Sequence, residues 1–127
     1  MSLTALALLM ATSAATPGTG TLWLDGEAHE MEVTMCDRDT NTAGARGALA
    51  GGDAISVMIQ RWPGLHALSV VHDNAQWVHR GPEDSAEAPD LRDWTGDGQL
   101  AASGTVAVFP PIRDATMEVR FEGQCPV

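Results

Sequence analysis

Residues 115 to 125 form an alternating stretch that constrains the fold more than any other segment. Apolar or small residues occupy every odd position from Ala115 to Cys125, and polar residues occupy the even positions. A period of two is typical of a β-strand with one face on a core. The stretch ends at one of only two cysteines, and the other, Cys36, closes a second alternating run that begins at His29. The pattern therefore predicts a β domain whose early hairpin and last strand are joined by a disulfide.

The cysteine pair also indicates the compartment. An even number of cysteines in a small domain is typical of a disulfide in an exported protein, because the cytosol keeps thiols reduced. In strict alternation from Met31, however, Cys36 falls on the polar face of its strand with Glu32, while Cys125 falls on an apolar face. A β-bulge at Met35-Cys36, or a position of Cys36 just past the end of the strand, would turn the sulfur inward. Without either, the disulfide would lie at a sheet edge.

The first 15 residues predict an export signal. An apolar run from Leu3 to Ala11 is followed by small residues up to Ala15, which matches the core and the cleavage site of a signal peptide. The run is too short to cross a bilayer as a helix, so we expect no transmembrane helix in the mature chain. No Lys or Arg precedes the run, and the alternative is a structural N-terminal helix. We therefore predict a signal peptide over 1–15 and one exported bacterial β domain over 16–127, in the periplasm, in the cell envelope or secreted.

The charge of the chain excludes one class of partner. The sequence has 17 acidic and 7 basic residues, a net charge of -10, and all its basic residues are dispersed arginines. Binding of nucleic acid requires a concentrated positive surface. We therefore expect no nucleic-acid partner, and the length of 127 residues fits a single domain.

The remaining segments predict about seven short strands. Asp25-Gly26 is a tight turn between the strands 20–24 and 29–35. The other predicted strands are 55–59, 66–72, 76–79, 99–109 and 115–125, while 40–52 and 81–90 are predicted loops, the first with a possible helical turn at 45–49. Short strands separated by Gly, Pro and Asp turns favour an antiparallel β-sandwich or small barrel over βαβ units.

Three motifs lie on these predicted strands. Leu24-Asp25-Gly26 opens the hairpin that ends in Cys36, Asp97-Gly98-Gln99-Leu100 runs into Ala102-Ser103-Gly104-Thr105-Val106, and Met117-Glu118-Val119 leads to Cys125-Pro126. In these motifs the chain resembles the LpqH-type mycobacterial lipoprotein antigens, over most of the exported part except 61–96. The resemblance implies a small β-rich envelope domain with a Cys36–Cys125 disulfide and no catalysis. The lipid-acceptor cysteine of that family is absent here, so the resemblance leaves membrane anchoring open.

Candidate metal ligands are scattered along the chain. His66 and His72 share a strand face, but six positions separate them by about 20 Å, too far to ligate one ion. The low-specificity candidates are therefore His66, His79, Asp93 and Asp97, in a periplasmic protein that binds copper or calcium. The competing interpretation is that these histidines lie at the surface and that the acidic segment is a solvated loop. We predict no cofactor.

Two tryptophans and the lack of catalytic motifs give the functional hypothesis. Trp62 and Trp94 adjoin turn residues and are candidate contacts for a sugar or protein, unless they plug the ends of the β core. The sequence contains no motif for an activated nucleophile, a phosphate-binding loop or a redox dithiol. We therefore predict a non-catalytic, antigen-like or binding domain whose partner is a protein or an envelope component. A metal-binding protein and an enzyme with an unrecognised site are the alternatives.

Overall fold

The described part of the chain is built from β-strands. The computed structural model describes residues 16–49, 51–72, 74–94 and 96–127, so the predicted signal segment 1–15 lies outside it. The strands are β2 (Thr19–Leu24), β3 (Glu27–Asp37), β4 (Thr42–Ala48), β5 (Ala54–Trp62), β6 (Leu65–His72), β7 (Ala75–Pro82), β8 (Asp90–Leu91), β9 (Gln99–Phe109) and β10 (Thr116–Gln124). Within these ranges no helix has the length and apolar character that a membrane span requires.

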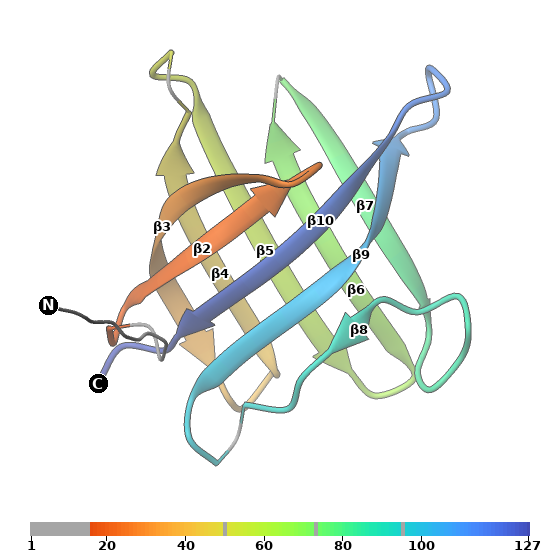
Figure 1. The fold of residues 1–127 in the computed structure, drawn as a ribbon. Helices are drawn as coiled ribbons and strands as arrows, with labels where there is room; N and C mark the ends of the chain where they lie inside the picture. The colour runs from red at the N-terminus through yellow and green to blue at the C-terminus, as the bar shows by residue number, and fades with distance from the viewer. Residues whose placement is uncertain (1–15, 50, 73, 95) are drawn as a thin grey trace, which may run out of the picture.

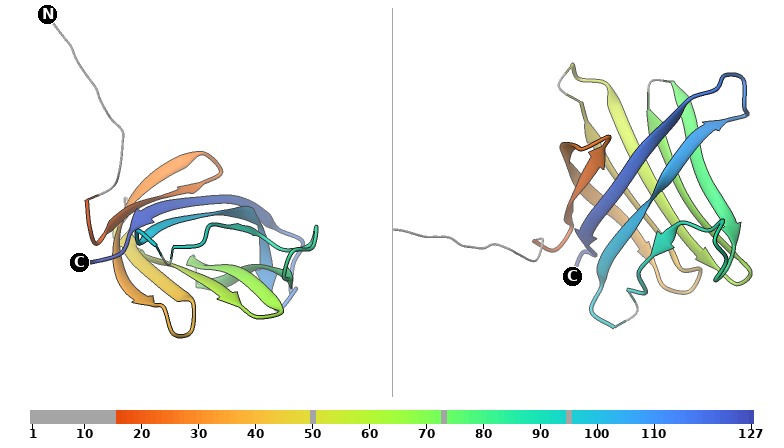
Figure 2. Two further views of the ribbon diagram at one scale, coloured as in Figure 1. Left: turned by 90° about the horizontal axis from the view of Figure 1, so that it is seen from below. Right: turned by 45° about the vertical axis from the view of Figure 1, so that its right-hand side comes forward.

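Eight antiparallel strands close into a barrel (Figure 1). Each strand from β2 to β6 pairs with the next, β7 pairs with β9, and β10 lies between β9 and β2. The two-residue strand β8 is an addition that pairs with β9. In the view from below, the connection from β7 to β9 crosses the opening of the ring (Figure 2). The predicted antiparallel β fold is confirmed, and it takes the form of the barrel.

The C-terminal strand β10 closes the ring because it pairs along both of its edges, with β2 and with β9. Met117, Val119 and Phe121 are buried, as the alternation predicts. The Phe121 ring packs over Gly20 and Gly123, which are opposite each other in the β2–β10 register. A Cβ at Gly20 would lie 2.8 Å from Phe121 Cζ, so the two glycines make room for the ring.

The barrel interior is filled by apolar side chains from all eight strands. An eight-stranded barrel is just wide enough for side chains to fill it. The largest side chains that are fully buried are Trp94, Phe121, Leu22, Ile55, Ile59, Leu68, Leu100, Val70 and Val106. This packed core makes the barrel a rigid support for whatever its outer surface carries.

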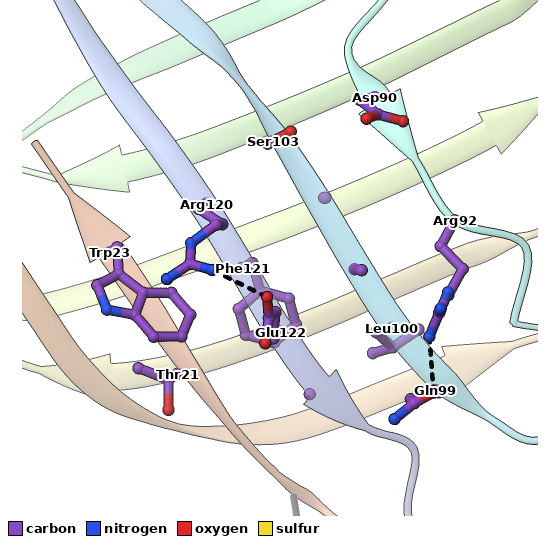
Figure 3. A pocket seen from close by; sticks show the side chains of 13 residues that line it. Thr21, Trp23, Asp90, Arg92, Gln99, Leu100, Ser103, Arg120, Phe121 and Glu122 are labelled. Atoms are coloured by element: carbon purple, nitrogen blue, oxygen red, sulfur yellow. Dashed lines mark hydrogen bonds and ion pairs between the residues drawn. The ribbon is translucent and has the colours of Figure 1, made fainter. Parts of the chain in front are cut away.

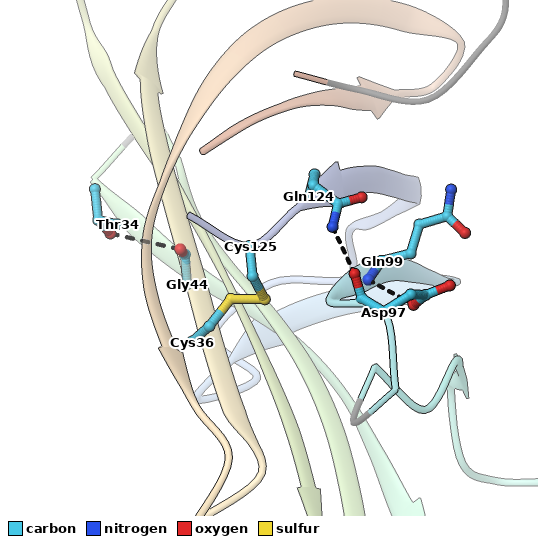
Figure 4. The surroundings of a disulfide bond; sticks show 7 residues. All are labelled: Thr34, Cys36, Gly44, Asp97, Gln99, Gln124 and Cys125. Atoms are coloured by element: carbon cyan, nitrogen blue, oxygen red, sulfur yellow. Dashed lines mark hydrogen bonds between the residues drawn. A yellow bond between two sulfur atoms is a disulfide. The ribbon is translucent and has the colours of Figure 1, made fainter. Parts of the chain in front are cut away.

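A bulge in β3 directs Cys36 toward the core. The β3–β4 register shifts between Val33 and Met35, so one residue more is present on β3 than on β4 at this point. Beyond the shift Met35 is exposed and Cys36 packs against the core. Cys36 forms a disulfide with Cys125, with the two Cα atoms 5.9 Å apart (Figure 4). The disulfide is confirmed, and the bulge lies immediately before the position that the sequence pattern predicts.

The segment predicted as a loop over 40–52 contains the strand β4, so that prediction is wrong, as is the helical turn at 45–49. The physical reason is strand crowding. A Cβ at Gly47 would lie 2.6 Å from the carbonyl oxygen of Glu30 and 2.8 Å from the sulfur of Met31. Small residues are needed here, and small residues show no hydrophobic period. With β4 and β8 added, the sheet has nine strands instead of about seven.

Candidate functional site

The six candidate residues from the sequence lie toward one end of the barrel, where the β5–β6 and β7–β9 connections meet. They are the candidate ligands His66, His79, Asp93 and Asp97 and the candidate contacts Trp62 and Trp94. The two connections are joined by hydrogen bonds between Gly64 and Glu83, one of which runs from the Gly64 amide to the Glu83 carboxylate over 3.0 Å. Sharing one end of the barrel does not bring the six side chains together.

Each candidate histidine has a different neighbour. The His66 side chain is buried, and its Nε2 lies 3.8 Å from the Glu83 carboxylate. The His79 ring packs against Gly104, and its Nε2 lies 2.9 Å from the carbonyl oxygen of Glu87. Among the residues that the structure describes, no three His, Cys, Asp or Glu side chains are arranged to hold a metal ion. The metal-binding alternative therefore gains no support from these positions.

The two candidate aspartates lie in the β7–β9 connection and contact residues of β5, β9 and β10. Asp93 Oδ1 lies 3.5 Å from Arg61 Nη1. Asp97 Oδ1 accepts a hydrogen bond of 2.9 Å from the amide of Gln99, and the Asp97 carbonyl accepts one of 2.7 Å from Gln124 (Figure 4). These contacts fix the connection beside the disulfide.

The two candidate tryptophans differ in exposure. Trp94 is completely buried, which agrees with the interpretation that it plugs the end of the β core. Trp62 is 40% exposed, and its indole N–H donates a hydrogen bond of 3.0 Å to Thr42 Oγ1. Only Trp62 of this pair therefore offers a surface to a ligand.

A hollow in the described surface lies elsewhere, on the outside of the barrel. It has a volume of about 640 Å³ and extends over β2, β10, β9 and β8 (Figure 3). One side is formed by Thr21 and Trp23, the other by Asp90 and Arg92, and the small residue Ser103 lies between them. We call this hollow the outer groove, and its lining also includes Gln99, Leu100, Ala101, Ala102, Arg120, Phe121, Glu122 and Gly123.

A cation–aromatic pair forms one side of the outer groove. Trp23, Arg120, Ser103 and Asp90 occupy one row of the sheet, because each is opposite the next in register. The guanidinium carbon of Arg120 lies 3.8 Å from the centre of the Trp23 ring. Arg120 Nη1 also donates a hydrogen bond of 3.0 Å to the Glu122 carboxylate (Figure 3). Arg120 is thereby oriented along the groove.

The opposite side of the groove is held by hydrogen bonds to β9. The Arg92 amide donates to the Ala101 carbonyl over 2.8 Å, and Arg92 Nη1 donates to Gln99 Oε1 over 2.6 Å. The segment that carries Asp90 and Arg92 is therefore fixed against β9. Two guanidinium groups, two carboxylates, hydroxyl groups and an indole ring thus line one groove on a rigid sheet.

The outer groove continues toward the β2–β3 turn. A second hollow of about 560 Å³ shares Trp23, Ser103 and Arg120 with it, and is also lined by Gly26 and Glu118. The two hollows together provide an elongated polar surface along β10. An elongated surface fits an extended ligand better than a compact small molecule.

The sequence pattern does not reveal the outer groove. The alternation of β10 places Arg120 and Glu122 on the outer face, but only the closure of the barrel brings them beside Trp23 and Ser103. Trp62 and Trp94 adjoin turn residues, whereas Trp23 lies within a run expected to be a strand, where an aromatic residue is common, so its position carries no separate signal. Neither a known protein family nor a curated protein matches this chain, and the resemblance to LpqH-type antigens therefore stays a prediction.

Proposed function

We propose that this protein is an exported, non-catalytic domain of the cell envelope or the medium, and that it binds a protein or envelope component in the outer groove. The single observation that carries the proposal is the fixed pair of Trp23 and Arg120 facing Asp90 and Arg92 across a floor of small residues. The Cys36–Cys125 disulfide supports an oxidising compartment, because cytosolic thiols are kept reduced. The resemblance to LpqH-type antigens points in the same direction.

The chemistry of the groove favours an extended polar ligand. Because β10 is paired along both edges, its backbone offers no free edge for strand addition, and recognition depends on side chains. The partly exposed indole of Trp23 provides a flat contact, and guanidinium and carboxylate groups provide directional hydrogen bonds. A polar peptide segment or a glycan chain presents groups that match these side chains.

The composition of the groove supports a binding role over catalysis. Its hydroxyl groups belong to Thr21 and Ser103, and an attacking hydroxyl needs a base within hydrogen-bond reach. Among the described residues that line the groove there is no His, Lys or Cys. The Glu122 carboxylate is already engaged by Arg120, and Asp90, which is opposite Ser103 in register, forms no hydrogen bond with it among the described residues. These features suit binding by preformed contacts.

The proposal can be tested with immobilised arrays of envelope glycans and of extended peptides, probed with the labelled, oxidised protein. Two variants form a matched pair, because each removes one partly exposed indole. Trp23→Ala removes the indole of the outer groove, and Trp62→Ala removes the indole at the end of the barrel. Circular dichroism would establish that both variants are folded.

We expect the wild type to bind a subset of the array, Trp23→Ala to lose at least about tenfold in affinity, and Trp62→Ala to bind as the wild type does. Loss of binding in Trp62→Ala with full binding in Trp23→Ala would contradict the proposal and place the site at the end of the barrel. Turnover of any arrayed compound would contradict the non-catalytic role.

A further inference from the structure

The outward-facing positions of β4 to β7 carry no carboxylate within the described ranges, although the chain has 17 acidic residues. Successive register pairs define rows that run across these strands. One row consists of Met35, Gly44, Met58, Ser69, Val78 and Ala107, and it contains no charged side chain. We call the outward-facing positions of β4 to β7, together with Met35 and Phe109, the acid-free face.

The acid-free face also exposes large apolar side chains. A second row runs through Arg46, Ser56, Val71, Gln76 and Phe109. Val71 is 49% exposed, Phe109 43%, Met58 38% and Met35 37%. Among the described residues of the face, the charged groups are the guanidinium groups of Arg46 and Arg80, and Arg80 lies 5.0 Å from the centre of the Phe109 ring. A patch that is apolar and free of carboxylates is typical of an interaction surface.

The other side of the barrel has the opposite character. The row that crosses β3, β2, β10 and β9 contains Glu30, Thr21, Glu122 and Ala101. The neighbouring row ends at Asp90, and Glu32 and Glu118 face outward nearby. The acidic residues are therefore unevenly distributed, and the outer groove belongs to the acidic side.

We propose that the acid-free face binds a second copy of this chain, so that the protein forms a symmetric dimer with both outer grooves exposed. Two molecules of net charge -10 repel each other, and a contact between their acidic sides would bring carboxylates together. Contact through the acid-free faces brings apolar side chains together and keeps the carboxylates apart. An anionic membrane is a poorer occupant, because the face has only two arginines to offset the net negative charge.

The size of the face is sufficient for a weak dimer. Four strands about 4.8 Å apart, with lengths of about 23 to 30 Å, present of the order of 500 Å² per copy. Burial of about 1,000 Å² in total is near the lower limit for a specific interface. We therefore expect reversible association in the micromolar range, with dimer and monomer in exchange.

Sedimentation velocity of the oxidised protein between about 1 µM and about 300 µM tests this proposal. Two variants, Val71→Glu and Met58→Glu, place a carboxylate in the middle of the acid-free face. Ala28→Glu adds the same charge at an exposed strand position outside both the face and the groove lining, and serves as the matched control. Thermal melts establish that each variant is folded, and two independent positions guard against local misfolding at either one.

We expect the wild type and Ala28→Glu to dimerise with increasing concentration, and the two face variants to raise the dissociation constant at least about tenfold. Added salt should tighten the wild-type dimer, because it screens the repulsion between the two acidic chains. A wild type that stays monomeric overturns the proposal, and binding to phosphatidylglycerol vesicles by that monomer would assign the face to lipid. Dimers of unchanged affinity in both face variants, or a dimer that salt dissociates, would also overturn it.

Discussion

Removal of the disulfide should lower the free energy of unfolding of the barrel by an amount that depends on the length of chain between the two cysteines. Cys36 and Cys125 are separated by 89 positions, so the disulfide closes a loop that contains every strand from β4 to β10. The entropy lost by an unfolded chain with a closed loop of this size corresponds to about 4.6 kcal/mol at 25 °C. For a domain of this length the corresponding fall in Tm is about 15 to 20 °C.

The double variant Cys36→Ala/Cys125→Ala, compared with the oxidised wild type by differential scanning calorimetry, measures this effect. Because β10 remains paired with both β2 and β9, we expect the variant to keep the far-ultraviolet circular dichroism of the wild type at 25 °C. Wild type treated with reductant should melt near the temperature of the variant. A fall of less than about 5 °C in both samples would refute the reasoning, because the unfolded chain would then gain little freedom when the disulfide is absent.

Two further predictions concern the packing of β10 inside the barrel, each measured as the free energy of unfolding in urea. Gly20→Ala should destabilise by about 2 kcal/mol, since the added Cβ would lie 2.8 Å from the Phe121 ring, whereas Gly51→Ala, with nothing within 4 Å, should change stability by less than about 0.5 kcal/mol. Phe121→Ala should cost about 3 to 5 kcal/mol because the ring is fully buried, and Phe109→Ala, on the surface, should cost less than about 1 kcal/mol. Equal effects within either pair would contradict the packing described here.

The parts of the fold that sequence patterns predict well are those with large alternating side chains. In β10 the apolar residues Met117, Val119 and Phe121 must all face the core, because a shift of the strand register by one residue would expose all three. The alternation of β3 also showed that Cys36 needs an irregularity or a strand end to face the core, and the structure has a bulge between Val33 and Met35. Hydrophobic periodicity thus placed Cys125 on the apolar face, whereas the face of Cys36 depended on the bulge.

The strand β4 shows why other parts were not predictable. Its residues are small because neighbouring strands approach closely at Gly47, and this crowding is a property of the closed barrel that local composition does not express. The outer groove has the same origin. Trp23 and Arg120 lie far apart in sequence and become neighbours only when β10 pairs with β2. Sequence patterns predict whether a side chain points into the barrel or outward, but only the closure of the barrel determines which outward side chains become neighbours.

The most direct test of the central claim is an NMR titration of the oxidised protein with a ligand from the array, in which the chemical shifts of the backbone amides and of the indole N–H groups are followed. The account predicts that shifts concentrate in the outer groove, at the Trp23 indole N–H and at the amides of 101–103 and 120–122. Shifts concentrated at Trp62 and along 83–98, with the groove amides unchanged, would contradict it.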